Sequence, residues 1–322
     1  MGVIRVQTKD NTVAAVSQQI IGQVRRVVVG KDQTLIWVLA AILAKGHILL
    51  EDIPGVGKTT MALAFSKVLG LECNRVQFTP DVLPSDVTGY SVLQQNNGKM
   101  VYQPGAVLCN LFLADELNRA TSRTQSALLE AMEEGQVTVD GVSHVIPKPF
   151  VVMATQNPTG AAGTQLLPDS QMDRFYIRLN MGYPSVKDEV AMILNRQEGN
   201  PLDKLSPMLS RGELMAMQNQ VAATYVKENV VRYIVELVNA TRNHKDILRG
   251  ASPRATLSVT AMAKAIAQLQ GRDYVTPTDV QAVFVQTVAH RLLLTPAAEA
   301  KELTAEKVLR GIISEVKAPR VS

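Results

Sequence analysis

Residues 47–60 read HILLEDIPGVGKTT, an apolar tetrad followed by a glycine-bearing loop that ends in Gly-Lys-Thr. The tetrad has the length of a buried strand, and residues 61–69 favour a helix. Glycines between a strand and a helix let backbone N–H groups surround phosphate oxygens, and the helix N-terminus adds favourable partial charge. The stretch therefore predicts a phosphate-binding loop at the carboxyl end of a strand.

Two side chains of this loop carry the chemistry of phosphate binding. Lys58 can reach the β- and γ-phosphates of a nucleotide, and Thr59 can ligate Mg²⁺. Asp52 departs from the G-x-x-x-x-G-K-[ST] pattern, because it stands where the first glycine is expected. The half of the loop that cradles the phosphates is intact, so we expect nucleotide binding by Pro54, Gly55, Val56, Gly57, Lys58, Thr59 and Thr60.

Strands and helices alternate on both sides of the loop. Apolar runs of strand length occur at residues 75–78, 111–114, 150–155 and 175–179, and helical patterns at 12–28, 31–45 and 122–134. This alternation predicts an α/β fold with a mostly parallel sheet that helices cover on both faces. At about 150 residues per domain, the 322 residues suggest two domains.

Two β-hairpins interrupt the alternation. The first is expected over residues 91–102, with a polar tip formed by Gln95, Asn96, Asn97 and Gly98. The second is expected over residues 136–145 around Asp140-Gly141, a favoured two-residue turn. We expect both hairpins as insertions into the α/β domain.

The strand pattern stops near residue 184, and from Val186 onward the sequence reads as helix throughout. Ser252 is expected to cap a helix that has Pro253 at its first position. We therefore expect a nucleotide-binding αβα core over residues 1–184, which includes the N-terminal helices, and an all-α domain over residues 185–322.

Two adjacent acids, Asp115 and Glu116, follow the apolar run at residues 111–114. Asp115 would hold Mg²⁺ through water, and Glu116 would polarise the attacking water, which are the two tasks of phosphoryl transfer to water. Taken alone, the same pair could also cap a short helix. The nearby phosphate loop favours the catalytic interpretation.

Three further residues are candidates for the γ-phosphate. Asn157 follows a predicted strand at the sheet edge where ligands bind, and could orient the water beside Glu116. Arg174 and Arg254 are the remaining candidate cations. Taken alone, Asn157-Pro158 could be a turn, and both arginines could be solvated surface charges.

Composition excludes several classes of protein. The charge balance of 33 Lys and Arg against 29 Asp and Glu gives a net charge of +4, and the 4% of aromatic residues do not alternate with basic ones, so nucleic-acid binding is not expected. The longest apolar run, residues 35–44, is shorter than the ~20 residues of a membrane-spanning helix. Without a secretory signal at the N-terminus, we expect a cytoplasmic protein that does not insert into membranes.

Cysteines and histidines give no sign of a disulfide or a metal cluster. Cys73 and Cys109 lie in different apolar segments, so we expect two reduced thiols. The four histidines are scattered and show no metal-binding spacing. The sequence therefore predicts no metal site built from protein ligands alone.

The sequence resembles the MoxR family of AAA+ ATPases over residues 24–294. The likeness is carried by residues 49–59, 78–89, 111–120, 154–158, 167–175 and 250–255. It includes FTPD at residues 78–81, LPSDVTG at 83–89 and LLEAMEEG at 128–135, which generic P-loop enzymes lack. The match is specific to this family.

The resemblance implies a fold and a role for each candidate residue. It implies an AAA+ P-loop core, a helical lid as the second domain, and two hairpins that line the axial pore of a ring. By the same likeness Lys58 and Thr59 belong to Walker A and Asp115 and Glu116 to Walker B, with ATP and Mg²⁺ as cofactors. Asn157 would be sensor 1, Arg174 the arginine finger and Arg254 sensor 2, while Val28, Val29 and Gly30 would lie near the adenine.

The resemblance also implies partners. An arginine finger supplied by a neighbouring copy requires a head-to-tail interface, which closes into a homo-oligomeric ring, most simply of six subunits. Members of the family typically act on a protein client with a separate von Willebrand A-domain partner, in metal insertion or the maturation of complexes. Lys58 and Arg254 would share the γ-phosphate, so its loss would let the lid rotate.

Four alternatives remain open at this point. The chain could be the motor subunit of a magnesium chelatase, or a DNA helicase-like ring, which the absence of a basic, aromatic patch disfavours. It could be a nucleotide-gated scaffold with little turnover, which Glu116 argues against. A small-molecule kinase would leave the hairpins, the acid pair and Arg254 without a role.

Overall fold

The structure is a computed structural model, and it describes residues 12–52, 55–95, 98–157, 167–197 and 199–320. Its centre is a five-stranded sheet with the strand order β2-β5-β8-β1-β9. Every neighbouring pair in this sheet is parallel. The strands are β1 (Ile48–Glu51), β2 (Cys73–Gln77), β5 (Leu111–Asp115), β8 (Val151–Gln156) and β9 (Ile177–Leu179).

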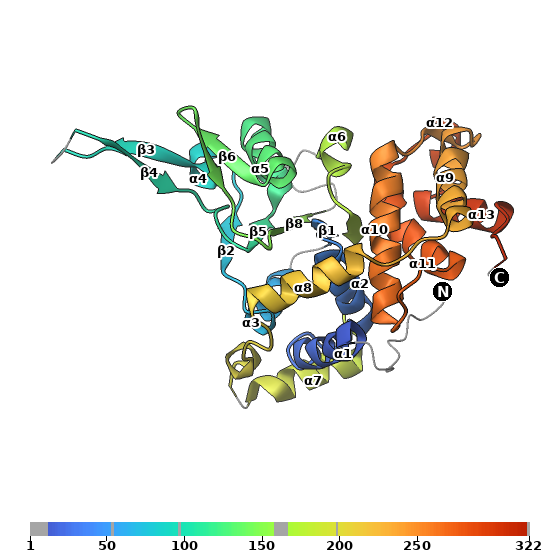
Figure 1. Ribbon diagram of the computed structural model, residues 1–322, viewed down its shortest axis with the longest axis horizontal. Coiled ribbons are helices and arrows are strands. Elements are labelled where there is room, and N and C mark those ends of the chain that lie inside the picture. The colour runs from blue at the N-terminus through green and yellow to red at the C-terminus, as the bar shows by residue number, and fades with distance from the viewer. Residues whose placement is uncertain (1–11, 53–54, 96–97, 158–166, 198, 321–322) are drawn as a thin grey trace.

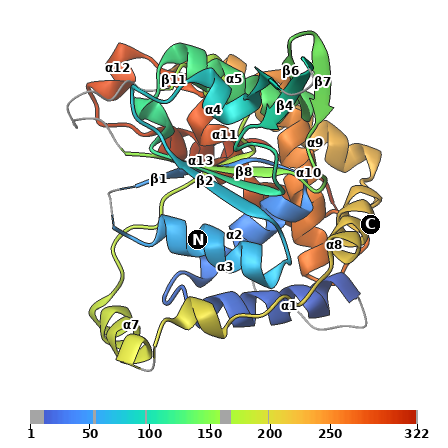
Figure 2. The same cartoon turned by 90° about the vertical axis from the view of Figure 1, so that its left-hand side faces the viewer.

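Helices cover both faces of the sheet, as expected (Figure 1). Helices α1 (Thr12–Arg25), α2 (Asp32–Leu43) and α3 (Lys58–Val68) lie on one face, and α4 (Pro84–Thr88) and α5 (Ser122–Glu134) on the other (Figure 2). Successive residues of a strand point to opposite faces, so Leu113 belongs to the apolar core beneath α1–α3, and Phe112 to a separate core beneath α5. The predicted α/β class is confirmed.

Both predicted hairpins form. They are β3 (Gly89–Leu93) with β4 (Met100–Pro104), and β6 (Gln136–Val139) with β7 (Val142–Val145). Asp140 and Gly141 have φ angles of 50° and 76°, the positive values that a tight two-residue turn requires. The β3–β4 hairpin projects from the body of the molecule, and the ring of its Tyr102 stacks on His144 at 3.6 Å (Figure 1). At the expected tip of this hairpin, Asn96 and Asn97 lie outside the described residues.

The C-terminal part of the chain is mostly helical. Its longer helices are α7 (Val186–Gln197), α8 (Arg211–Ala222), α9 (Glu228–Arg242), α10 (Pro253–Leu269), α11 (Pro277–Val288) and α13 (Ala305–Glu315). Its short helices are η2 (Pro201–Lys204), η3 (Ala289–Arg291) and α12 (Pro296–Glu299). Two further short helices, η1 (Leu117–Arg119) and α6 (Asp169–Met172), connect strands of the central sheet.

One expectation for the C-terminal region was wrong. Strands β10 (Ile247–Arg249) and β11 (Leu293–Leu294) form an antiparallel pair where only helix was expected, because strands of three and two residues are too short to show a period. Ser252 is the N-cap residue of α10 and Pro253 begins the helix, as expected, but Ser252 makes no side-chain capping bond. Its Oγ instead donates to Asp173 Oδ2 at 2.9 Å, so the hydroxyl binds a carboxylate of the α/β region rather than the first turn of the helix.

One apolar core joins the two parts of the chain. All nine residues from Leu35 to Leu43 of α2 are buried, and α2 packs against α8 and α10 as well as against α1. The cluster of buried residues that contains α1, α2 and α3 continues into α8, α9, α10 and α11. Among the described residues, no helix is long and apolar enough to cross a membrane.

Candidate functional site

The phosphate loop lies at the carboxyl edge of the sheet, between β1 and α3. Because β1, β5 and β8 are parallel neighbours, the residues that follow them meet at this edge. Gly55 and Gly57 have φ angles of 86° and 95°, a left-handed conformation in which glycine is unstrained. The chain thereby enters α3 at Lys58 with its first N–H groups not used within the helix. Pro54 lies outside the described residues.

Lys58 is buried among acids at this edge. Its Nζ donates to the backbone oxygen of Asp52 at 2.5 Å and to Asn157 Oδ1 at 3.4 Å. Burial lowers the pKa of Lys58, and the negative charges of Asp52, Asp115 and Glu116 oppose that shift. Such a site suits an anionic ligand that binds together with a metal cation, because the anion can pair with Lys58 and the cation with the acids.

Asp115 lies next to Thr59, as the metal-ligand prediction requires. Thr59 Oγ1 is 3.3 Å from Asp115 Oδ2, and Thr155 Oγ1 donates to Asp115 Oδ1 at 2.7 Å. A hydroxyl and a carboxylate are oxygen ligands of the kind that Mg²⁺ accepts together with nucleotide phosphates. In the part of the chain that the structure describes, no group of three or more His, Cys, Asp or Glu is arranged to hold a metal ion.

Sequence reasoning missed a cation on Asp115. Arg75, on the neighbouring strand β2, donates to Asp115 Oδ2 from Nη2 at 2.8 Å and from Nε at 3.2 Å. The arginine thus occupies the same carboxylate oxygen as Thr59. Only the pairing of β2 with β5 brings Arg75 here, and no local motif signals it.

Glu116 is held in an uncommon backbone conformation. Its φ and ψ of 55° and 46° are left-handed, which costs a non-glycine residue energy and is found often at active sites. Its Oε1 accepts from Asn157 Nδ2 at 3.0 Å, and its Oε2 pairs with Arg119 Nη1 at 2.8 Å. Although Glu116 precedes η1, it makes no side-chain capping bond, so the helix-cap alternative fails.

A cavity of about 550 Å³ adjoins the phosphate loop. Its lining includes five of the residues predicted to bind nucleotide or to lie near its base: Val28, Val29, Val56, Gly57 and Thr60. Gly30 does not line it; a Cβ there would lie 2.2 Å from the Asp188 carboxylate, so this glycine permits the close approach of α7. The volume falls within the usual range for small-molecule sites.

One wall of this cavity was missed by sequence reasoning. It is formed by Tyr183, Pro184 and α7, including Met192 and Ile193. The sequence signal that could have found it is the apolar pattern of α7. In the structure this helix buries no residue, and Val186, Val190 and Ile193 are all exposed. Apolar side chains without a core partner indicate a binding surface.

Arg174 and Arg254 lie at the other edge of the sheet. Tyr176 N donates to His47 O at 2.8 Å, which places Arg174 beside the amino ends of β9 and β1. Arg174 Nη1 pairs with Glu133 Oε2 at 2.9 Å, and Arg254 pairs with the other oxygen of Glu133. The structure therefore brings these two arginines together, paired with Glu133 rather than solvated. Because Lys58 and Arg254 of the same chain lie at opposite edges, the expectation that they share one γ-phosphate was wrong.

A buried arginine of the C-terminal region fixes the backbone around Arg174. Arg291 Nη2 donates to the carbonyl oxygens of Asp173 and Phe175 at 3.1 and 2.7 Å, on either side of Arg174. Burial lowers the pKa of Arg291 to about 10, and the charge of Asp173 opposes this. Sequence reasoning missed Arg291 because Asp173 and Phe175, which it contacts, are distant from it in the sequence.

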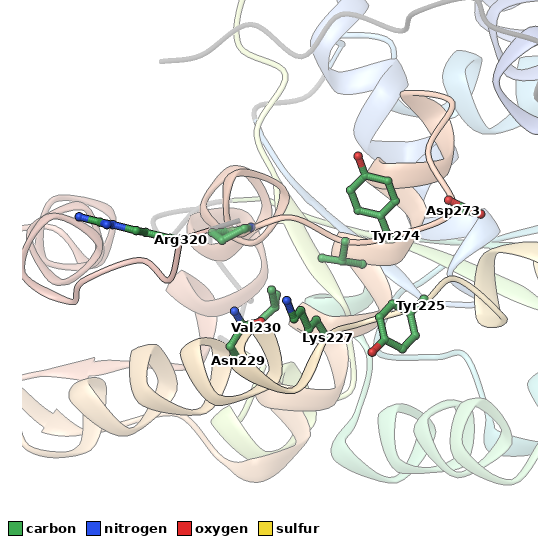
Figure 3. Close-up of a pocket in the computed structure, with 9 residues that line it drawn as sticks. Tyr225, Lys227, Asn229, Val230, Asp273, Tyr274 and Arg320 are labelled. Atoms are coloured by element: carbon green, nitrogen blue, oxygen red, sulfur yellow. The ribbon is translucent and has the colours of Figure 1, made fainter. Parts of the chain in front are cut away.

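A second cavity of about 460 Å³ lies in the C-terminal helical region (Figure 3). Its lining includes Tyr225, Lys227 and Tyr274 from the connections that lead into α9 and α11, Asn229 from the first turn of α9, and Arg320 near the C-terminus. None of the predicted site residues lines it. The candidate site is therefore the cavity at the phosphate loop.

Comparisons with known proteins agree with this geometry. The model of the "ATPase family associated with various cellular activities (AAA)" matches residues 47–177, and the model "AAA lid domain" matches residues 239–312. The chain is 46% identical over 296 residues to the uncharacterized protein YeaC of Bacillus subtilis, with 92% of each chain covered. It is 40% identical over 314 residues to Chaperone MoxR1 of Mycobacterium tuberculosis, covering 95% of this chain and 83% of that one.

A solved structure from Cytophaga hutchinsonii has a TM-score of 0.89 to this chain at 34% identity, over 96% of both chains. The likeness extends across the sheet and the helices that follow it, so the C-terminal helical region is the lid of an AAA+ fold. On this agreement of sequence, fold and site, the chain belongs to the MoxR family of AAA+ ATPases.

Proposed function

We propose that this chain binds ATP with Mg²⁺ at the carboxyl edge of the sheet and hydrolyses it to ADP and phosphate. The observation that carries the proposal is the 3.0 Å contact between Asn157 Nδ2 and Glu116 Oε1, beside the phosphate loop. A carboxylate oriented by an amide can accept a proton from water, while Lys58 stabilises charge on the γ-phosphate. Asn157 keeps the reactive oxygen of Glu116 directed into the site.

Thr59 and Asp115 are the proposed Mg²⁺ ligands. When bound, the ion would neutralise charge on the β- and γ-phosphates. Arg75 must release an oxygen of Asp115 for this to happen, because both Arg75 nitrogens donate to Oδ2. Arg75 is half exposed, so its side chain can move into solvent.

The base is proposed to bind between Val28, Val29 and the wall formed by Tyr183 and α7. This wall offers the apolar side chains of Tyr183, Met192 and Ile193 in the same cavity as the phosphate loop. Aromatic and aliphatic side chains on two sides suit a planar base. Binding there would connect α7, at the start of the lid region, to the occupancy of the site.

The arginines at the amino edge support a ring. Arg174 and Arg254 lie at the amino edge of the sheet, whereas Lys58 of their own chain lies at the carboxyl edge. We therefore propose that both arginines reach the nucleotide of a neighbouring copy. A head-to-tail interface of this kind closes into a ring, for which six subunits is our proposal. An arginine supplied in this way raises the rate by about 10³- to 10⁵-fold.

The proposed output is the remodelling or activation of a protein client. The two hairpins expose apolar side chains that a folded monomer has no reason to expose, among them Leu93, Met100 and Val145, which are 58–69% accessible. A separate von Willebrand A-domain protein is the partner we propose, with metal insertion or complex maturation as the setting. A magnesium-chelatase-like motor remains the alternative of the same class.

One contact favours a second function, that of a nucleotide-gated scaffold with little turnover. Arg119 pairs with Glu116 Oε2 at 2.8 Å and would weaken this carboxylate as a base if it stayed there during turnover. Replacing Arg119 with Ala separates the two functions. A turnover rate that rises severalfold supports the scaffold, and one that is unchanged or falls supports the ATPase.

The direct test of hydrolysis is Glu116→Gln. The variant keeps the amide contact with Asn157 but removes the base, so we expect turnover to fall about 10²- to 10⁴-fold. Nucleotide affinity, measured by titration calorimetry, should change by less than about tenfold. Glu315→Gln, an exposed glutamate at the end of α13, is the matched control. Unchanged turnover in Glu116→Gln would refute the base assignment.

A further inference from the structure

Asp52, the residue that departs from the usual phosphate-loop pattern, is buried and hydrogen-bonded to the backbone of a distant segment. It is only 4% exposed, and its Oδ2 accepts hydrogen bonds from the backbone N–H groups of Met181 and Gly182, each at 2.6 Å. Bonds to a charged acceptor are short and strong, as these are. Glycine at this position would leave both buried N–H groups without this acceptor.

Lys31 holds the same segment from its carbonyl side. Its Nζ donates to the backbone oxygens of Met181, Gly182 and Tyr183 at 2.6, 3.1 and 3.0 Å. One carboxylate at the end of β1 and one ammonium just before α2 therefore bind residues 181–183 together. We call these two side chains and their backbone partners the 181–183 clamp.

The clamped segment leads directly to the cavity wall. Tyr183 and Pro184 line the cavity, and α7 begins two residues later, at Val186. Segment 181–183 thus determines where α7 starts, and so how α7 faces the phosphate loop. Gly182 takes a φ of 61°, which allows the chain to turn at the clamp.

Asp52 is also bonded to the phosphate-binding lysine. Lys58 Nζ donates to the backbone oxygen of Asp52, while the side chain of Asp52 holds residues 181 and 182. One residue therefore contacts the group that would bind phosphate and the segment that positions α7. A phosphate that draws Lys58 away removes one of the bonds that fix Asp52.

We propose that Asp52 is a positioning residue that couples occupancy of the phosphate loop to the position of residues 181–183 and α7. The proposal deepens the proposed function and rests on it only for the identity of the ligand. A glycine there would keep the phosphate cradle and lose the coupling. Asp52 therefore adds to the loop a link that the usual pattern lacks.

Hydrogen exchange of the backbone amides, followed by mass spectrometry, tests the clamp without nucleotide. Asp52→Gly should speed exchange at Met181 and Gly182 at least about tenfold. Asp52→Asn keeps an oxygen acceptor but loses the charge, and Lys31→Met removes the opposite partner, so each should speed exchange a fewfold. Amides of β5 should be unaffected. Exchange at residues 181 and 182 that is unchanged in all three variants would overturn the clamp.

A nucleotide titration tests the coupling. With a non-hydrolysable ATP analogue and Mg²⁺, wild-type protein should show altered exchange in α7, and Asp52→Gly should lose most of this response while binding within about tenfold of wild-type affinity. Asp279→Asn is the matched control: Asp279 is also buried and also accepts a backbone N–H, from Thr276 at 2.8 Å, but in α11.

The possible outcomes are distinguishable. A full α7 response in Asp52→Gly overturns the coupling, and so does loss of the response in Asp279→Asn, because general destabilisation would then explain it. If Asp52→Gly does not fold, Asp52→Asn decides, since a full response without the charge also contradicts the proposal. Failure of wild-type protein to bind the analogue would refute the proposed function, while the nucleotide-free exchange would still test the clamp.

Discussion

The two edges of the central sheet differ in how their charges are held. At the carboxyl edge, the acids Asp115 and Glu116 are paired with Arg75 and Arg119, which are 48% and 41% exposed. At the amino edge, Arg291 is almost completely buried, with a side chain only 1% exposed. Exposed arginines can leave their partners, whereas a buried one cannot without a large cost. The acids of the carboxyl edge can therefore exchange partners, whereas Arg291 stays in place and fixes the backbone around Arg174 at the amino edge.

This difference also explains why each edge looks incomplete. The carboxyl edge has the phosphate loop, and its described arginines Arg75 and Arg119 are paired with acids, whereas Arg174 and Arg254 lie on Glu133 at the amino edge. Under the proposed function, the two edges are half-sites that meet only between copies. Each can be removed without touching the other.

Mixing two inactive variants gives the largest expected effect. Lys58→Ala disables the carboxyl edge and Arg174→Ala the amino edge, so each alone should lose about 10³-fold or more of its turnover. Co-assembled in equal amounts, about a quarter of interfaces would join two intact edges, and turnover should recover to roughly that fraction. Turnover that stays at the level of the single variants would show that the two edges do not complete one another.

Removing Arg291 tests the amino edge as a rigid support. Arg291→Ala would remove the ion pair with Asp173 and leave the carbonyl oxygens of Asp173 and Phe175 without this buried donor, so the free energy of unfolding should fall by about 3–5 kcal/mol. Urea unfolding measures this. Arg75→Ala, at the exposed edge, is the comparison and should cost less than about 1 kcal/mol. Equal losses in the two variants would contradict the contrast between the edges.

Acid should destabilise the protein through a histidine at the amino edge. Burial lowers the pKa of His47 to about 4, and Val152 N donates to its Nδ1 at 2.9 Å, which requires the neutral ring. Because the folded chain takes up this proton less readily than the unfolded one, stability is complete above pH 6.5 and falls as the pH drops toward 4, by up to about 3 kcal/mol.

The measurement is the free energy of unfolding between pH 7 and 4 for wild-type protein and His47→Gln. The glutamine does not titrate, so its slope should be shallower. His290, whose pKa burial lowers well below the usual value, acts in the same direction and remains in both proteins, so part of the slope should persist. Identical slopes would exclude His47 as a source.

The smallest expected effect is on the metal requirement. Arg75 competes for the Asp115 oxygen that lies beside Thr59, so Arg75→Ala should lower the Mg²⁺ concentration needed for half-maximal nucleotide binding a fewfold. Titration of Mg²⁺ at fixed nucleotide, read by binding rather than turnover, measures this. A higher requirement in the variant would show instead that Arg75 supports the metal site.

Local signals made the carboxyl edge predictable. Helix α5 has the bounds expected from sequence because Thr121 caps it and Gly135 ends it. The β6–β7 hairpin also has the expected strands, because Asp140-Gly141 leaves few other turns. The predicted residues of the carboxyl edge each lie at or after the end of a recognisable strand, and parallel pairing then brings them together. They are Lys58, Thr59, Asp115, Glu116 and Asn157.

The remaining contacts depend on pairings across the chain. Asp52 and Met181 are 129 residues apart, and nothing in the sequence near Asp52 signals an acceptor for that segment. The same holds for Glu133 with Arg254, and for Arg291 with Asp173. The two-residue strand β11 shows no period of its own and forms only because β10 lies beside it. Such contacts require the fold before they can be identified.

The apolar core shared by α2, α8 and α10 has a practical consequence for dissecting the protein. Cutting the chain after Pro184 would separate it at the expected domain boundary, yet it would uncover the side of α2 that those later helices shield. A truncated N-terminal fragment should therefore aggregate when produced alone. Co-production of both fragments should rescue it by non-covalent reassembly.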